Sequence, residues 1–203
     1  LSKTLFYRST ALLTNDSKSN ILNLIKGRRN TKQFCEENIS VAEIEVLLEA
    51  AVWAPNHRNN EPWRFFTVRR ESPVRDDISN GIIALQERNS SGKLPDLHKQ
   101  RITQDVARQP WLIFVYSEIS DQLEISEENY GAVCCAIQNM QLMATAIGLS
   151  VGWSTGGISK IENLDNIFGI EEPLKIVGVL TVGYPESTVE KTRTHYNDKT
   201  VWL

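Results

Sequence analysis

The feature that most constrains the fold is an apolar helical stretch over residues 131–147. Its apolar side chains recur at the spacing of one helix face, and Gly148 follows it as a C-terminal cap. That face consists of Val133, Ala136, Ile137, Met140, Ala144 and Ile147. A helix with so apolar a face belongs at the centre of a domain or in an interface between subunits.

Two apolar stretches of strand length lie on either side of this helix in the sequence. Residues 111–117 and the stretch "LKIVGVLTVGYP", residues 174–185, are typical of buried strands. Residues 63–68, rich in aromatic and β-branched side chains, and residues 150–153 predict two further strands. Helices and strands mix without a strict βαβ rhythm, which predicts an α+β fold with a mixed, mostly antiparallel sheet.

Two capping boxes predict where helices begin. Ser40 with Glu43 is the first, and Ser159 with Glu162 is the second, whose helix is expected to run to Phe168. The remaining helices are predicted over residues 19–28 and, in pieces, over residues 73–109.

Composition excludes several classes of protein. The net charge of −3 is too small to predict binding to nucleic acid or to a membrane surface. No run approaches the roughly 18 apolar residues of a membrane span. The three cysteines lack metal-ligand spacing, which predicts reduced thiols in the cytoplasm, and the three histidines are too scattered to propose a metal site.

The chain shows no internal repeat and no low-complexity linker, so we expect one domain over residues 18–203. Residues 1–17 are expected to form an N-terminal arm, although their hydroxyls and basic residues also resemble a transit peptide. The C-terminal arm, about residues 186–203, is polar but ends in "TVWL". Apolar residues after a polar tether predict that the arm packs on something, such as a second subunit.

Four stretches are candidates for a site, and each also has an ordinary structural interpretation. Residues 26–34, "KGRRNTKQF", are either cations at a helix C-terminus or arginine forks that clamp phosphate. Residues 54–66, "APNHRNNEPWRFF", are either a capping loop or a hydrogen-bonding rim for a flat heterocycle. Residues 152–157, "GWSTGG", either connect a strand to a helix or hold backbone against a ligand. Residues 190–193, "EKTR", taken alone, are a solvated surface.

In this order, the stretches resemble the nitroreductase family of flavin enzymes. The family's R-R-S-x-R/K-x-F box is matched by residues 28–34, and its A-P loop ending in P-W-x-F by residues 54–65. Its A-x-G-L helix end, G-Y-P turn and K-x-R pair are matched by residues 146–149, 183–185 and 191–193. The resemblance covers about residue 18 to the end and is greatest to the compact, short-chain subgroup.

The resemblance implies a three-layer α+β sandwich that forms an interlocked homodimer, with FMN bound between the subunits and the C-terminal arms exchanged. It implies an enzyme that passes hydride from NAD(P)H through the flavin to a nitroaromatic, quinone or similar small oxidant in a ping-pong cycle. No protein acid or base is named as catalytic. Two alternatives remain open: a specialised flavin-fold enzyme, such as a dehalogenase or flavin-modifying enzyme, and a flavin-binding redox protein with little turnover.

The resemblance also assigns residues to the cofactor. Positions around the FMN phosphate are matched by Arg28, Lys191 and Arg193, and positions along the ribityl chain and pyrimidine edge by Arg29, Asn30 and Lys32. Positions that reach the flavin from the partner subunit are matched by His57 and Asn59, with Trp53 at a further contact position. The segment along the isoalloxazine ring is matched by Trp153, Ser154, Thr155 and Gly156.

The chain departs from the family pattern at two places. Asn30 stands where the family usually has Ser, which keeps a side chain that can both donate and accept. Glu61 stands where the family usually has Gln before Pro-Trp, and it replaces an amide by a group that only accepts. We expect a nearby cation, such as Arg58 or Arg64, to compensate the charge of Glu61.

Overall fold

The computed structural model describes residues 15–187 and 189–203, so most of the predicted arm of residues 1–17 lies outside the described part. The fold is built on a four-stranded sheet in the order β1-β2-β4-β3. The strands are β1 (Trp63–Val68), β2 (Trp111–Glu118), β3 (Ser150–Ser154) and β4 (Leu174–Gly183). Each adjacent pair is antiparallel, and a parallel bridge joins Asn30 to Val151 at the β3 edge. The four predicted strands are confirmed.

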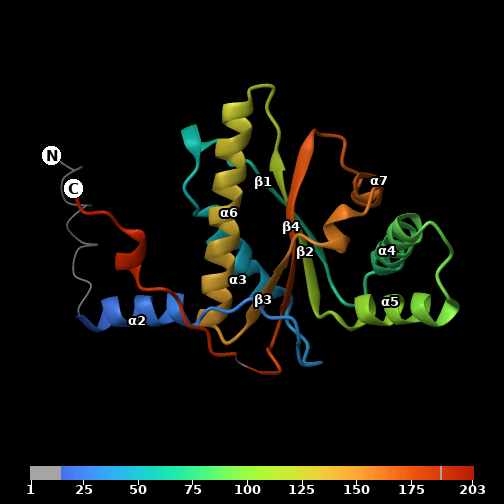
Figure 1. Cartoon of the computed structure of the whole chain (residues 1–203), viewed down its shortest axis with the longest axis horizontal. Coiled ribbons are helices and arrows are strands. Elements are labelled where there is room, and N and C mark those ends of the chain that lie inside the picture. Colours follow the sequence, from blue (N-terminus) through green and yellow to red (C-terminus); the bar gives the residue numbers. More distant parts are fainter. Residues whose placement is uncertain (1–14, 188) are drawn as a thin grey trace.

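The sheet lies between two layers of helices (Figure 1), which confirms the α+β sandwich. The α-helices are α2 (Asn15–Gly27), α3 (Val41–Val52), α4 (Val74–Ser90), α5 (Asp96–Arg108), α6 (Leu123–Ala146) and α7 (Leu164–Phe168). The described residues also form the short 3-10 helices η1 (His57–Asn59), η2 (Gly157–Lys160) and η3 (Tyr196–Lys199). Helices α3 and α6 cover one face of the sheet, whereas α4, α5 and α7 lie beyond the other.

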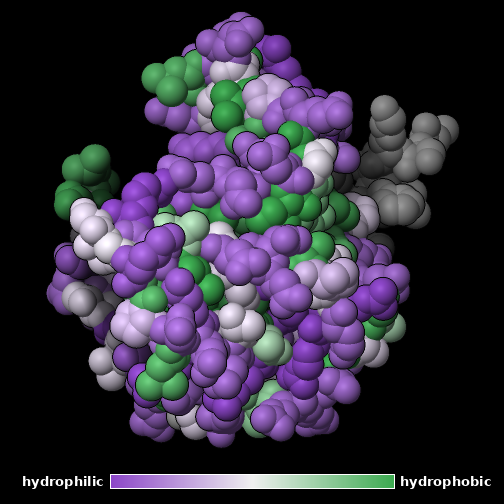
Figure 2. Space-filling view, turned by 90° about the vertical axis from the view of Figure 1, so that its right-hand side faces the viewer, coloured by the Kyte–Doolittle hydropathy of each residue, from purple (hydrophilic) through white to green (hydrophobic). Residues whose placement is uncertain are grey.

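The outer surface on the α4, α5 and α7 side is mostly hydrophilic (Figure 2), as expected for a layer that faces water. On the opposite side, α2 and the C-terminal arm extend away from the body of the molecule (Figure 1). None of the helices in the described part is long and apolar enough to cross a membrane.

Helix α6 carries the core on its side of the sheet. Val133, Ala136, Ile137, Met140 and Ala144 are all 0% exposed, which confirms the predicted apolar face. The helix begins at Leu123, well before the predicted residue 131, because its polar first turns at the surface show no apolar periodicity. Ile147 lies beyond the helix end and is 39% exposed, so it does not belong to the buried face. Gly148 has a φ of +83°, as its capping role requires.

The first predicted capping box is confirmed, and the second is wrong. Ser40 Oγ accepts from Glu43 N at 3.2 Å, while Glu43 Oε2 accepts from Ser40 N at 2.8 Å. Ser159 instead donates its hydroxyl proton to Gly156 O at 2.9 Å, and Glu162 pairs with Arg88 of α4. The region therefore forms η2 and then the short α7 in place of one longer helix.

Candidate functional site

Residues 28–34, here called the basic box, begin where α2 ends and continue along the free edge of β3. Thr31 N donates to Val151 O at 3.3 Å, next to the parallel bridge between Asn30 and Val151. Gly152 permits this close approach, because a Cβ there would lie 2.2 Å from Thr31 O. The sheet edge thus fixes the backbone from which the side chains of the box project.

The chain that follows β4 lies beside the same box. Phe34 pairs with Pro185 in an antiparallel bridge, and Cys35 N donates to Tyr184 O at 2.9 Å. Glu186 N donates to Gln33 O at 3.2 Å, so the G-Y-P turn is tied to the end of the box. This pairing brings the start of the C-terminal arm to residues that lie more than a hundred positions earlier.

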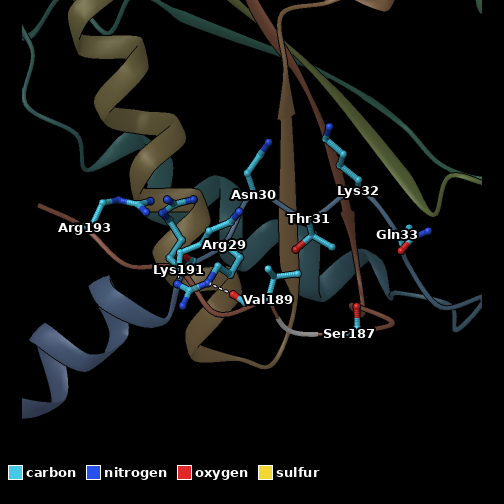
Figure 3. A pocket seen from close by; sticks show the side chains of 10 residues that line it. Arg29, Asn30, Thr31, Lys32, Gln33, Ser187, Val189, Lys191 and Arg193 are labelled. Carbon is cyan, nitrogen blue, oxygen red and sulfur yellow. Dashed lines mark hydrogen bonds between the residues drawn. The ribbon is translucent and has the colours of Figure 1, made fainter.

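The two segments line an open pocket of about 690 Å³. Its lining consists of Arg28, Arg29, Asn30, Thr31, Lys32, Gln33, Ser187, Val189, Lys191 and Arg193. Figure 3 shows Lys191 and Arg193 gathered with Arg29 at one end, whereas Gln33 and Ser187 lie at the other. The residues predicted from the basic box and from the "EKTR" stretch are therefore brought together.

Cations of the pocket lie close to one another. Burial lowers the pKa of Arg28, and the nearby charges of Arg193 and Arg29 lower it further. Within residues 15–187 and 189–203, no carboxylate pairs with Arg28, Lys191 or Arg193. Crowded cations without an acid favour a bound anion, and the planar guanidinium fork suits phosphate oxygens.

Arg29 differs from its neighbours because its guanidinium already binds backbone. It donates to Val189 O, to Lys26 O at 2.5 Å and to Arg28 O at 2.9 Å. The bond to Val189 is drawn in Figure 3. Arg29 thus joins the end of α2 to the C-terminal arm and helps to shape the wall of the pocket.

Asn30 links the basic box to the "GWST" segment. Its Oδ1 accepts from Trp153 N at 2.5 Å, so its amide group has donors left for a ligand in the pocket that it lines. The Trp153 indole donates from Nε1 to Val177 O at 3.4 Å and packs against the α6 side of the core. Ser154, Thr155 and Gly156 follow along the chain and are exposed.

The remaining predicted residues do not line this pocket, and the loop of His57 lies near the opposite end of α6. Trp53 caps the end of α3 and is 79% exposed, and His57 Nδ1 lies 3.8 Å from Glu128 Oε2 near the start of α6. Gly27, directly before the basic box, lies beside Thr145 at the other end of α6. A Cβ at Gly27 would lie 4.0 Å from Thr145 Cγ2. At about 1.5 Å per residue, these two ends of the helix are about 25 Å apart.

Sequence reasoning missed Thr31, Gln33, Ser187 and Val189 as lining residues. Thr31 and Gln33 alternate with predicted residues inside the box, so their position could have indicated them. Thr31 donates its hydroxyl proton to Ser150 Oγ at 2.8 Å, a contact that supports the wall of the pocket. Ser187 and Val189 belong to no motif, and no signal in the sequence could have found them.

Comparisons with known proteins show the family and the fold of this chain. A family model described as the nitroreductase family matches residues 25–184. The protein YfhC of Bacillus subtilis (strain 168), provisionally named an NAD(P)H nitroreductase, is 28% identical over 177 residues, covering 87% of this chain and 90% of that protein.

Two solved structures share the fold. A nitroreductase-like family protein from Bacillus cereus superposes with a TM-score of 0.78 at 28% identity, over 95% of this chain and 99% of that one. A protein from Desulfovibrio desulfuricans, crystallised in complex with FMN, superposes with a TM-score of 0.70 at 22% identity, over 90% of this chain and 96% of that one.

Proposed function

This chain belongs to the nitroreductase family, and from that premise we propose that it is an FMN-dependent oxidoreductase that uses NAD(P)H to reduce a small oxidant. The oxidant is a nitroaromatic, a quinone or a similar small molecule. YfhC bears the name of an NAD(P)H nitroreductase, and a protein of the same fold was crystallised with FMN. We place the enzyme in the cytoplasm, where free thiols such as those of Cys35, Cys134 and Cys135 stay reduced.

The observation that carries this proposal is the convergence of Arg28, Lys191 and Arg193 on one pocket, with no acidic partner for them in the part of the chain that the structure describes. A phosphate monoester supplies the missing negative charge and accepts several charge-assisted hydrogen bonds at once. FMN ends in such a group. The sequence offers no glycine-rich loop for a second, adenosine-bearing half, so we assign FMN and not FAD.

The other pocket residues fit the remainder of the cofactor. The amide donors of Asn30 suit the acceptor atoms of a flavin, since its Oδ1 is already bound to Trp153 N. Lys32 is exposed and lines the pocket, so its charge can stabilise negative charge on a flavin. When bound, FMN supplies the hydride and electron transfer, and these residues hold it and tune its charge.

The His57 loop and the basic pocket lie near opposite ends of α6, which supports a site shared between two subunits. His57 and Asn59 are too far from the basic pocket of their own chain to contact the same cofactor. Apolar residues also remain exposed on the side of α2 and the C-terminal arm, namely Ile21, Leu22, Ile25, Val201, Trp202 and Leu203. We therefore propose a homodimer in which these residues pack on the partner and the His57 loop completes the partner's site.

Titration of the apo-protein with FMN tests the cofactor assignment. We expect saturable binding with one FMN per chain, followed by loss of the flavin absorbance when NADH or NADPH is added without oxygen. Heating should then release unaltered FMN. An absence of FMN binding would refute the proposal, flavin that NAD(P)H does not reduce would favour a flavin-binding protein, and consumed flavin would favour a flavin-modifying enzyme.

A further inference from the structure

The loop that follows α3 adopts an unfavourable backbone. Arg58 and Asn59 have a φ of 54°, and Glu61 has a φ of 48°. The left-handed region disfavours residues that carry a Cβ, and it persists only where the surrounding structure enforces it. Asn60, between Asn59 and Glu61, keeps an ordinary φ of −69°.

One buried side chain anchors the loop to the body of the protein. Asn129, in the second turn of α6, is only 5% exposed. Its Oδ1 accepts from Asn60 Nδ2 at 3.2 Å, and its own Nδ2 donates to Glu118 O at 3.3 Å. Asn129 therefore ties the centre of the loop to the end of β2.

The other contacts of the loop are local or weak. Glu61 N donates to Asn56 Oδ1 at 2.9 Å and Asn60 N donates to His57 O at 3.1 Å, so both bonds lie within the loop and move with it. The side chains of the His57–Glu128 pair are 54% and 41% exposed, and such pairs contribute little. Arg64 Nη1 reaches Glu61 O only at 3.4 Å. Asn129 is thus the main buried anchor among the described residues.

We propose that Asn129 is a positioning residue for the flavin site. It holds residues 56–61 in the strained conformation that presents His57 and Asn59 to the cofactor of the partner subunit. Asn129 does not itself touch the cofactor. The inference rests on the proposed function, which supplies both the cofactor and the partner, but the anchoring of the loop can be measured without either.

The first experiment measures the anchor by limited proteolysis with trypsin. The exposed Arg58 lies in the loop, and a tightly held loop is a poor protease substrate. We expect Asn129→Ala to accelerate cleavage after Arg58 about tenfold, since a buried hydrogen bond is lost. Asn139→Ala is the matched control: Asn139 lies on the same helix and donates to Ala50 O at 3.1 Å, in α3 and outside residues 56–61. Equal cleavage in Asn129→Ala and Asn139→Ala would overturn the proposal.

The second experiment measures the effect on the cofactor in the same variants. We expect Asn129→Ala to bind FMN about tenfold more weakly and to shift the flavin midpoint potential, while Asn139→Ala changes neither. A faster cleavage with unchanged FMN affinity and potential would overturn the positioning role and leave the proposed function intact. If the wild type binds no FMN, the positioning role falls with the proposed function, and the proteolysis result still reports the anchor.

Because Asn129 is buried, its replacement could impair folding, and Asn60→Ala removes the same hydrogen bond from the exposed side. The double variant gives a cycle between the two residues. If they act through one bond, Asn60→Ala with Asn129→Ala weakens FMN binding no more than Asn129→Ala alone. Additive losses would show that the residues act separately and would overturn the anchor.

Discussion

Gly178 of β4 lies directly against the indole of Trp153: a Cβ at Gly178 would lie 2.2 Å from Trp153 Nε1. The neighbouring strands β3 and β4 therefore fit together only because one of them lacks a side chain at this point. Trp153 N in turn donates to Asn30 Oδ1. The glycine thus leaves room for the indole of a tryptophan whose backbone is hydrogen-bonded to Asn30.

Replacing this glycine should disturb both the core and the site. We expect Gly178→Ala to lower the free energy of unfolding by about 1–3 kcal/mol, because the extra methyl group must displace the indole. Urea denaturation and the near-ultraviolet circular dichroism of the tryptophans report the change. Gly92→Ala is the control, since a Cβ there meets only Ser90 O at 3.9 Å. A Gly178→Ala protein as stable as the wild type would contradict this packing.

Removal of the Arg28 side chain should weaken the binding of FMN. Truncating one partner of a buried charge-assisted contact costs about 2–5 kcal/mol, so we expect Arg28→Ala to bind FMN about 30- to 3,000-fold more weakly. At saturating FMN, the rate of flavin reduction by NAD(P)H should largely recover. Lys18→Ala, at an exposed position of α2, is the control. Equal dissociation constants for Arg28→Ala and the wild type would remove Arg28 from the site.

The Glu43 carboxylate should make the free energy of unfolding depend on pH. Hydrogen bonds from Ser40 and from the Tyr184 hydroxyl, at 2.9 Å, hold the pKa of Glu43 below its ordinary value. A lowered pKa stabilises the fold above the unfolded-state pKa, and this contribution is lost as the pH falls through the folded-state pKa.

We therefore expect the free energy of unfolding of Glu43→Gln at pH 7 to be lower than that of the wild type by about 0.5 kcal/mol, since the carboxylate is partly exposed. This gap between the two proteins should close as the pH falls. Urea unfolding from pH 7 down to pH 3 measures it. Glu45→Gln, an exposed position on the same helix, is the control. A gap that stays constant down to pH 3 would show that the charge of Glu43 is not the cause.

The C-terminal arm should hold the proposed dimer together. Trp202 is 79% exposed in the single chain. If it packs on a partner, Trp202→Ala should raise the dimer dissociation constant about tenfold or more, as removal of a buried aromatic residue does at other interfaces. Sedimentation over a range of concentrations measures this. Leu97→Ala is the control, because Leu97 is also exposed, at 62%, but lies on α5 in the layer on the other side of the sheet. A monomeric wild type with FMN bound would refute the shared site.

The elements predicted best from the sequence are those whose apolar side chains are buried. The periodicity of Val133 to Ala144 and the apolar run of β2 follow from packing on the sheet, and both are confirmed. The Ser159 box failed because a four-residue pattern ignores distant partners: Glu162 is drawn to Arg88 of α4 instead.

In the site, too, some features could be predicted and others could not. The resemblance to the nitroreductase family predicted that Arg28 would meet Lys191 and Arg193, and the structure brings them to one pocket. Their roles toward a cofactor, like those of His57 and Asn59, remain predictions. The bonds of Arg29 to backbone carbonyls could not be foreseen, because no pattern in the sequence marks Val189 O as an acceptor.

The bond from Arg29 to Val189 joins residues 160 positions apart, and the bond from Trp153 to Asn30 joins residues 123 positions apart. Hence a growing polypeptide cannot build the pocket early. The ribosome makes the four strands first, then residue 189, and then the cations at positions 191 and 193. Cofactor capture at full strength can therefore occur only after residue 193 has been made, and a chain stalled after β4 would have its hydrophobic core and Arg28 but would lack Lys191 and Arg193.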